Sequence, residues 1–319
     1  MAHQDVIAAP RPPATGAREA ADRRRGRRRR DRREYALFAL LIFPNAVLIL
    51  TFEYWPVLYN AFLSMTSWNM ISGTPQWVGF ANYVDLLTSP NFHRVLLNTA
   101  VFTGAVVIGS VVLGLLLALL FNQKLHLRGV VRTAAFSPYV ISGAAVATLW
   151  LFLFDPNYGL SRLLFSLVGA DSPRWVTDAQ WAMPALIIAY LWKGMGFVAI
   201  IYLAGLQGLP EEYDEAARID GAGRWAIFRR ITLPLLSPVT FFVMVITIIG
   251  TFQAYDLIAV MTGGGPGIAT TTLSWFIYER AFKASDAGGA AAAAMILFVI
   301  LLAVTALQNA YSQRKVHYQ

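Results

Sequence analysis

Six long stretches of this sequence contain no charged side chain except one lysine. They cover residues 35–52, 95–121, 133–154, 179–209, 231–255 and 287–313, and the lysine is Lys193 in the fourth. A helix needs about 20 mainly apolar residues to cross a hydrocarbon core of about 30 Å. The first stretch reaches that length if it continues past Glu53 to near Leu63. Six such stretches separated by short loops favour a membrane bundle over the buried helices of a large soluble protein.

The composition supports this interpretation. Of the 319 residues, 57% are hydrophobic and 14% are charged, whereas soluble domains carry about 25% charged residues. The chain has no cysteine, which excludes disulfides, a thiolate nucleophile and Cys-ligated metal centres. We therefore expect an all-α membrane protein with six transmembrane helices.

The basic residues predict the orientation of this bundle. Twenty of the 26 Lys and Arg residues lie in the N-terminal segment 1–34, in the loops after the second and fourth stretches, or near the C-terminus. Cytoplasmic loops retain Lys and Arg, so both termini are expected in the cytoplasm. The predicted organisation is a disordered basic cytoplasmic tail (1–34), a transmembrane domain (35–310) and a cytoplasmic C-terminal tail (311–319). The arginines of the first tail suit anionic lipid better than a nucleic-acid patch or a cleaved signal peptide.

The loop between the fourth and fifth stretches, residues 207–238, is unusually informative. Pro210 suits a first helical turn, and Glu211 and Glu212 follow where the helix dipole favours negative charge. Ala216 and Ala217 keep the helix slim, and Gly221 can adopt the left-handed conformation that ends it. A second apolar segment then leads back to the membrane. Such a short, polar helix is not stable alone in water and needs a partner surface.

The spacing in this loop is also that of a known motif. Glu215-Ala216-Ala217, then Gly221, then Ile231-x-Leu233-Pro234 resembles the EAA motif of permease subunits in binding-protein-dependent ABC importers. Residues 77–83, 191–197 and 263–273 are similar to carbohydrate-uptake permeases of the maltose and glycerol-phosphate type. The resemblance covers residues 35–309, and only the tails fall outside it.

This resemblance implies a type I ABC importer permease in the bacterial cytoplasmic membrane. Its loop helix would be a coupling helix that docks in a cleft on a separate ATPase subunit. There Glu215 would meet a polar or basic group, Ala216 and Ala217 would allow close approach, and Gly221 would set the bend. The full set of expected coupling residues is Glu215, Ala216, Ala217, Asp220, Gly221, Ile231, Leu233 and Pro234.

The implied partners are a second related permease, a pair of ATPase subunits, an extracytoplasmic solute-binding protein and membrane lipid. The chain contains no G-x-x-x-x-G-K-[ST], so it lacks the P-loop that cradles phosphates. It also lacks H-E-x-x-H and G-x-S-x-G motifs, and its four histidines are scattered. We therefore expect no enzyme activity, no catalytic residue, no metal site and no bound cofactor in this chain, with ATP and Mg²⁺ held by the ATPase subunit.

Four polar residues within the apolar stretches or directly at the end of one are candidates for the solute pathway, because ionisable groups in a bilayer are costly. They are Lys193, Gln253, Tyr255 and Asp256. For Lys193, a structural role or pairing with a neighbouring subunit is the alternative. Gln253 and Asp256, three residues apart, would share a helix face. They could contact solute or another subunit.

Two other classes of function remain as alternatives. A self-contained ion-coupled transporter or channel would favour an inverted internal repeat, and the two halves show no convincing similarity. An integral membrane enzyme would need a clustered catalytic set. The resemblance narrows the solute to sugars, oligosaccharides, polyols or glycerol-phosphate-type compounds, with a slight preference for the last. It does not say which of the two permeases carries the solute site.

Overall fold

The computed structural model describes residues 35, 38–71, 73–123 and 127–315. The expected N-terminal tail and residues 316–319 of the C-terminal tail lie outside the described residues. The chain divides into two units, Met1–Tyr59 and Asn60–Gln319. In the described part, the regular secondary structure is helical apart from one pair of two-residue strands.

The first unit contains most of one apolar helical segment, which runs from Phe38 to Leu63 and ends in the second unit. It includes a π-helical turn, η1 (Leu50–Tyr54), followed by α2 (Trp55–Leu63). The predicted extension of the first apolar stretch past Glu53 to Leu63 is therefore confirmed.

The second unit begins with short elements that join the first and second apolar stretches. Strands β1 (Thr66–Ser67) and β2 (Gln76–Trp77) form an antiparallel pair. Helix α3 (Ala81–Thr88) follows, and the Asn82 amide donates hydrogen bonds to the carbonyl oxygens of Ser64 and Thr66, at 2.9 Å each. These bonds anchor the strand pair to α3.

The remaining elements of the second unit are helical. In chain order they are α4 (Pro90–Phe121), α5 (Arg128–Val140), α6 (Gly143–Leu153), α7 (Leu160–Ser166), α8 (Ala179–Gln207), α9 (Glu211–Ile219), α10 (Arg224–Ile227), η2 (Phe228–Thr232), α11 (Leu233–Leu235), α12 (Ser237–Phe252), α13 (Tyr255–Met261), α14 (Leu273–Tyr278), η3 (Glu279–Lys283) and α15 (Ala287–Lys315).

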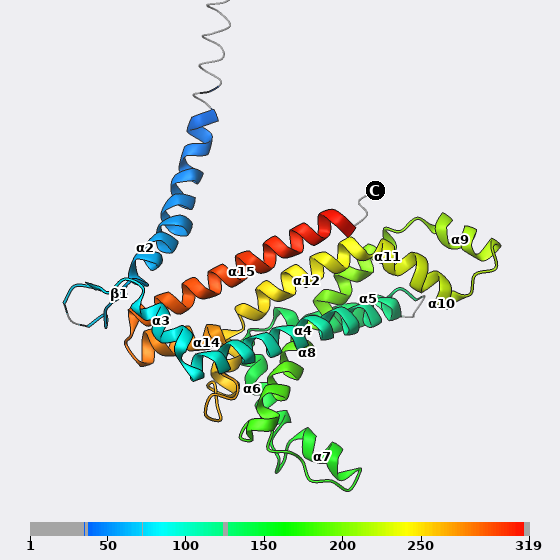
Figure 1. Ribbon diagram of the computed structural model, residues 1–319. Helices are drawn as coiled ribbons and strands as arrows, with labels where there is room; N and C mark the ends of the chain where they lie inside the picture. Colours follow the sequence, from blue (N-terminus) through cyan, green and yellow to red (C-terminus); the bar gives the residue numbers. More distant parts are fainter. Residues whose placement is uncertain (1–34, 36–37, 72, 124–126, 316–319) are drawn as a thin grey trace, which may run out of the picture. The chain divides into compact units, whose positions relative to one another are not determined.

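Helices α4, α12 and α15 run side by side along the unit (Figure 1). Helix α8 packs against α4 and α5. Glycines allow the closest of these contacts, because a Cβ at Gly196 would overlap the backbone carbonyl of Ala135. One core cluster lies where α4, α8 and α12 meet, around the fully buried Tyr202 and Val243. The bundle is therefore held by small residues at helix crossings and large side chains between them.

Within the described residues, four helices are long and apolar enough to cross a membrane without a break. They are Phe38–Leu63, Pro90–Phe121, Ala179–Gln207 and Ala287–Gln308. The number rises to six if each of two bent helix pairs counts as one span.

The two bent pairs correspond to the third and fifth apolar stretches. Helices α5 and α6 meet at 103°, because Ile141 and Ser142 are extended and the Ser142 hydroxyl caps α6 by accepting from the Ala145 N–H. The segment Arg224–Leu235 meets α12 at 61°. Pro238 is in the first turn of α12, where its missing N–H costs nothing. The apolar stretches by themselves do not show these bends, because hydropathy depends on residue type and not on the direction of the backbone.

Candidate functional site

A cavity of about 590 Å³ lies between the central helices of the second unit. Its walls come from α4, α5, α6, α8, α12 and α13, and from the break between the last two. The lining residues are Ser110, Tyr139, Gly143, Tyr190, Lys193, Gly194, Phe197, Val198, Phe242, Ile246, Thr247, Gly250, Gln253, Ala254, Asp256 and Leu257. Three of the four polar residues singled out in the sequence, Lys193, Gln253 and Asp256, therefore share one cavity.

Lys193 extends from the middle of α8 toward the end of α5. Its ammonium group donates a hydrogen bond to the carbonyl oxygen of Tyr139 at 3.3 Å. It also lies 5.3 Å from the centre of the Tyr139 ring, within the range of a cation–π interaction. The Tyr139 ring in turn stacks on Phe197 of α8, with ring centres 4.2 Å apart and planes 7° apart. Lys193 thus helps to hold the bent end of α5 against α8.

Asp256 lies against the first residue of α6. A Cβ at Gly143 would overlap the Asp256 carboxylate, so only glycine leaves room for this side chain. One carboxylate oxygen accepts the N–H of Leu257 at 2.9 Å. The positive end of the α6 dipole favours a carboxylate at this place. Through Asp256, the start of α13 therefore packs against the start of α6.

The expectation that Gln253 and Asp256 share one helix face is wrong. Helix α12 ends at Phe252, and α13 begins at Tyr255. Ala254, with ψ of 40°, separates them. The two side chains reach the same cavity because the chain turns between them.

Tyr255 is not among the residues that line this cavity. Its ring packs on Trp275 and Tyr278, at centre distances of 5.5 and 4.7 Å. The aromatic group that it joins continues to Phe282 and lies on α13, α14 and η3. The structure therefore separates Tyr255 from the other three candidates.

Sequence reasoning missed most of the cavity wall. Tyr139, Tyr190 and Phe242 lie inside apolar stretches, where an aromatic residue resembles any other core or lipid-facing residue. The packing of α5 against α8 brings Tyr139 beside Lys193, 54 positions later. No local signal in the sequence could have identified this pairing.

The expected loop helix is present as α9. It begins at Glu211, with Pro210 as the residue before the first turn, so Pro210 lies one position earlier than expected. Its first turn carries Glu211, Glu212 and Asp214. Ala217 is the one buried residue of α9, and Glu215 and Ala216 are exposed.

Gly221 ends α9 as the sequence indicated, with φ of +78°. The Ala222 N–H donates to the Ala217 carbonyl at 2.9 Å, and the Gly221 N–H donates to the Arg218 carbonyl at 3.1 Å. These two bonds form a Schellman motif. Asp220, just before Gly221, is exposed.

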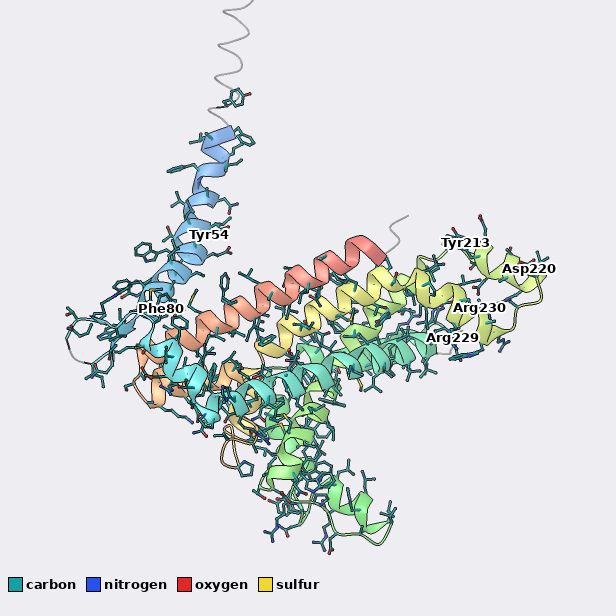
Figure 2. The ribbon with its side chains drawn as sticks, viewed as in Figure 1. Tyr54, Phe80, Tyr213, Asp220, Arg229 and Arg230 are labelled. Carbon is teal, nitrogen blue, oxygen red and sulfur yellow. The ribbon has the colours of Figure 1, made fainter. Side chains whose placement is uncertain are left out.

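The other predicted coupling residues lie on the return segment. Ile231 belongs to the π-helical turn η2, and Leu233 and Pro234 belong to α11. In Figure 2, Tyr213, Asp220, Arg229 and Arg230 lie at the end of the second unit opposite Phe80. The acidic helix and the basic return segment are therefore at the same end of the bundle.

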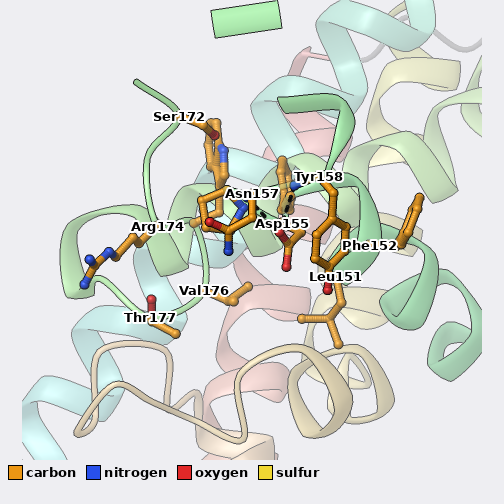
Figure 3. Close-up of a pocket in the computed structure, with 12 residues that line it drawn as sticks. Leu151, Phe152, Asp155, Asn157, Tyr158, Ser172, Arg174, Val176 and Thr177 are labelled. Carbon is orange, nitrogen blue, oxygen red and sulfur yellow. Dashed lines mark hydrogen bonds between the residues drawn. The ribbon is translucent and has the colours of Figure 1, made fainter. Parts of the chain in front are cut away.

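A second cavity, of about 660 Å³, lies where α6 ends and before α8 begins. Figure 3 shows Asp155, Asn157, Tyr158 and Arg174 among its lining residues. One Asp155 oxygen accepts the N–H groups of Asn157 and Tyr158, at 2.8 and 3.2 Å. Nothing in the sequence pattern indicated this cavity. Within the described residues, no group of three or more His, Asp or Glu side chains is placed to hold a metal ion.

Comparison with known protein families identifies the family to which the chain is similar. The family of binding-protein-dependent transport system inner membrane components matches residues 110–317. A probable ABC transporter permease protein of Pyrococcus horikoshii is 37% identical, over 83% of this chain and 92% of the relative.

Two further relatives have named solutes. The sn-glycerol-3-phosphate transport system permease protein UgpA of Yersinia pestis is 32% identical, over 88% of this chain and 95% of the relative. The trehalose/maltose transport system permease protein MalF of Thermococcus litoralis is 33% identical, over 86% and 92%.

Among solved structures, a chain of the bacterial alginate ABC transporter matches with a TM-score of 0.76 and 28% identity. The match covers 89% of this chain and 96% of that chain. That transporter was crystallised in complex with an alginate pentasaccharide-bound periplasmic protein.

Proposed function

The chain belongs to the family of binding-protein-dependent transport system inner membrane components, and we propose that it is one of two related permease subunits of an ATP-driven importer. It is an integral membrane protein and takes a sugar or glycerol-phosphate-type solute from an extracytoplasmic binding protein. The binding-protein partner is supported by the alginate transporter, whose structure includes a periplasmic protein. The second permease, the six-span count and the cytoplasmic position of both termini are parts of this proposal.

The observation that carries the proposal is the exposed helix α9. It has nine residues, of which only Ala217 is buried, and a helix this short has too few hydrogen bonds to be stable alone. The acidic first turn and the glycine at its end determine where α9 begins and ends, but they leave its surface exposed. A helix of this kind needs a partner, and a nucleotide-driven subunit on the cytoplasmic side would supply both the partner and the force.

The coupling surface of this proposal consists of exposed and small side chains. Glu215 is exposed and available to a polar or basic group of the ATPase. Ala216 allows close approach, and Asp220 extends the acidic surface to the end of the helix. Gly221 fixes the turn.

The return segment would transmit the displacement of α9. Ile231, Leu233 and Pro234 are neither fully buried nor part of a straight helix. They lie just before the 61° bend that leads into α12. A push on α9 would therefore reach the wall of the central cavity through α12, which contributes Phe242 and Thr247.

The central cavity is our candidate for the chain's part of the solute pathway. Lys193, Gln253 and Asp256 line it. Tyr255, the first residue of α13, stays in the proposal only as the neighbour of Asp256, because its own ring packs on Trp275 and Tyr278. ATP and Mg²⁺ would bind to the ATPase subunits.

The test is uptake into proteoliposomes that contain the assembled transporter, its binding protein outside and ATP inside. We expect uptake only when both permeases, the ATPase and ATP are present. Uptake by this chain alone, driven by an ion gradient, would show that it is a self-contained secondary transporter and would refute the proposal.

A further inference from the structure

We propose that the part of the pathway formed by this chain accepts an uncharged, polyhydroxylated solute and disfavours one that carries a phosphate, sulfonate or carboxylate. This inference rests on the proposed function, because it takes the central cavity to be on the solute's route. Relatives are named for glycerol 3-phosphate and for trehalose and maltose. Family membership therefore leaves the charge of the solute open.

The charge of the cavity wall is balanced. Among the described residues that line the cavity, Lys193 and Asp256 are the two charged ones. Proteins that bind phosphate or carboxylate groups usually do so with arginine or lysine, or with helix N-termini that have free N–H groups. A single lysine opposed by a carboxylate in the same cavity gives no net positive charge to attract an anion.

The one lysine is also already engaged. Its ammonium group bonds to the Tyr139 carbonyl and lies over the Tyr139 ring. To reach an anionic solute it would give up both contacts and release the end of α5. Lys193 therefore holds α5 in place at the cavity wall and is not free to bind an anion.

The helix N-terminus at the cavity already holds an acid. Helix α6 begins at Gly143 in the cavity wall, and the Asp256 carboxylate fills the space beside that residue. The positive end of this helix is the place where an anionic group would bind most easily. An anionic solute would instead meet a carboxylate, and like charges repel.

The rest of the wall suits a sugar. The aromatic side chains Tyr139, Tyr190, Phe197 and Phe242 line the cavity, and the ring surfaces that remain uncovered can pack on the C–H surfaces of a sugar ring. Hydroxyl and amide groups that can pair with sugar hydroxyls come from Ser110, Thr247 and Gln253. A mainly apolar wall with a few polar groups is typical of small-molecule sites.

The experiment uses a pair of probes that differ by one phosphate group, trehalose and trehalose 6-phosphate. The assembled transporter, two permeases with the ATPase pair, is placed in lipid nanodiscs without the binding protein, so that only the membrane pathway selects. Equilibrium binding of each tritiated probe is then measured. We expect trehalose to bind at least about tenfold more tightly than its phosphate, because the phosphate meets the Asp256 carboxylate.

Two variants identify the source of this preference. D256N keeps the shape of the side chain and removes its charge. The ratio of the dissociation constants of trehalose 6-phosphate and trehalose should therefore fall by about tenfold. D85N removes an exposed carboxylate from α3, outside the cavity, and should leave the preference unchanged.

Three results would overturn the inference. The first is equal or tighter binding of trehalose 6-phosphate by the unmodified transporter. The second is an unchanged preference in D256N. The third is no binding of either probe by a preparation that still performs ATP-driven uptake with its binding protein. By contrast, a complete transporter that shows no ATP-driven uptake of any solute would refute the proposed function itself.

Discussion

Helix α9 and the central cavity differ in how they are built. The start of α9, its acidic first turn and its glycine end all lie within the 13 residues from Pro210 to Ala222. The cavity instead joins side chains from α4 to α13, and two of its key contacts pair Lys193 with Tyr139 and Asp256 with Gly143. The first site is set by neighbours in sequence and the second by neighbours in space. Substitutions should therefore act on α9 through charge and local backbone conformation, and on the cavity through steric fit between helices and through the charge of the side chains that line it.

The largest effect is expected from Glu215→Lys on α9. Glu and Lys have similar helix propensity, so α9 should form and the chain should insert normally. Reversing an exposed charge at a docking surface should weaken ATPase binding by at least about tenfold, because like charges across an interface cost several kcal/mol. Co-purification of the ATPase with the permease measures this loss.

Glu215→Gln is the graded control for that substitution. It removes the charge without reversing it, so its effect should be intermediate. Wild-type assembly and uptake in the lysine variant would show that α9 does not dock through Glu215.

A second large effect is expected from Gly221→Val. Gly221 has φ of +78° and no heavy atom within 4 Å of the position that a Cβ would occupy, so the penalty is conformational. A β-branched residue in this conformation costs about 1–3 kcal/mol, which should shift the end of α9 and reduce the stimulation of ATP hydrolysis by solute. Transport-coupled ATPase activity in proteoliposomes is the measurement.

Gly223→Val is the matched control, two residues later in the same turn. Gly223 has φ of −72° and open space around its Cβ position, so valine fits there. If both variants keep full coupling, the turn has no part in force transmission.

In the cavity, Gly143→Ala should act through overlap. The added methyl group would collide with the Asp256 carboxylate, and overpacking of this kind costs about 1–3 kcal/mol. We expect a lower melting temperature of the purified transporter and weaker trehalose binding. Gly194→Ala is the comparison, since Gly194 lines the same cavity with nothing within 4 Å of its Cβ position. Equal behaviour of the two variants would mean that Asp256 does not lie against α6.

The smallest effect is expected from Arg218→Ala. Arg218 and Asp214 form an exposed ion pair at 3.8 Å, four residues apart on α9. Exposed pairs of this kind contribute about 0.5 kcal/mol or less, so uptake should stay within about twofold of wild type. A loss as large as that of Glu215→Lys would instead place Arg218 in the docking surface.

The sequence predicted the elements that depend on local chemistry. Long apolar stretches indicated α4, α8 and α15, because crossing lipid requires length and hydrophobicity that can be read directly from residues in a row. Pro210, the acidic turn and Gly221 indicated α9 to within one residue, because helix ends are determined by the residues beside them.

The break in the fifth stretch lay beyond this kind of prediction. Gln253 and Asp256 were expected on one helix face, and the chain turns between them at Ala254. An uncharged stretch has the same hydropathy whether it is straight or bent, so no pattern of apolar residues could indicate the turn.

By itself, then, the sequence determined that the chain is a helical membrane protein of the importer-permease type, and where its exposed acidic helix begins and ends. Only the tertiary structure decided that Lys193, Gln253 and Asp256 share a cavity and that Tyr255 does not. The physical reason is that helix ends follow from groups a few residues apart, whereas a cavity depends on the directions of several helices. Those directions are set by close contacts such as that of Asp256 with Gly143, more than 100 residues apart in the chain.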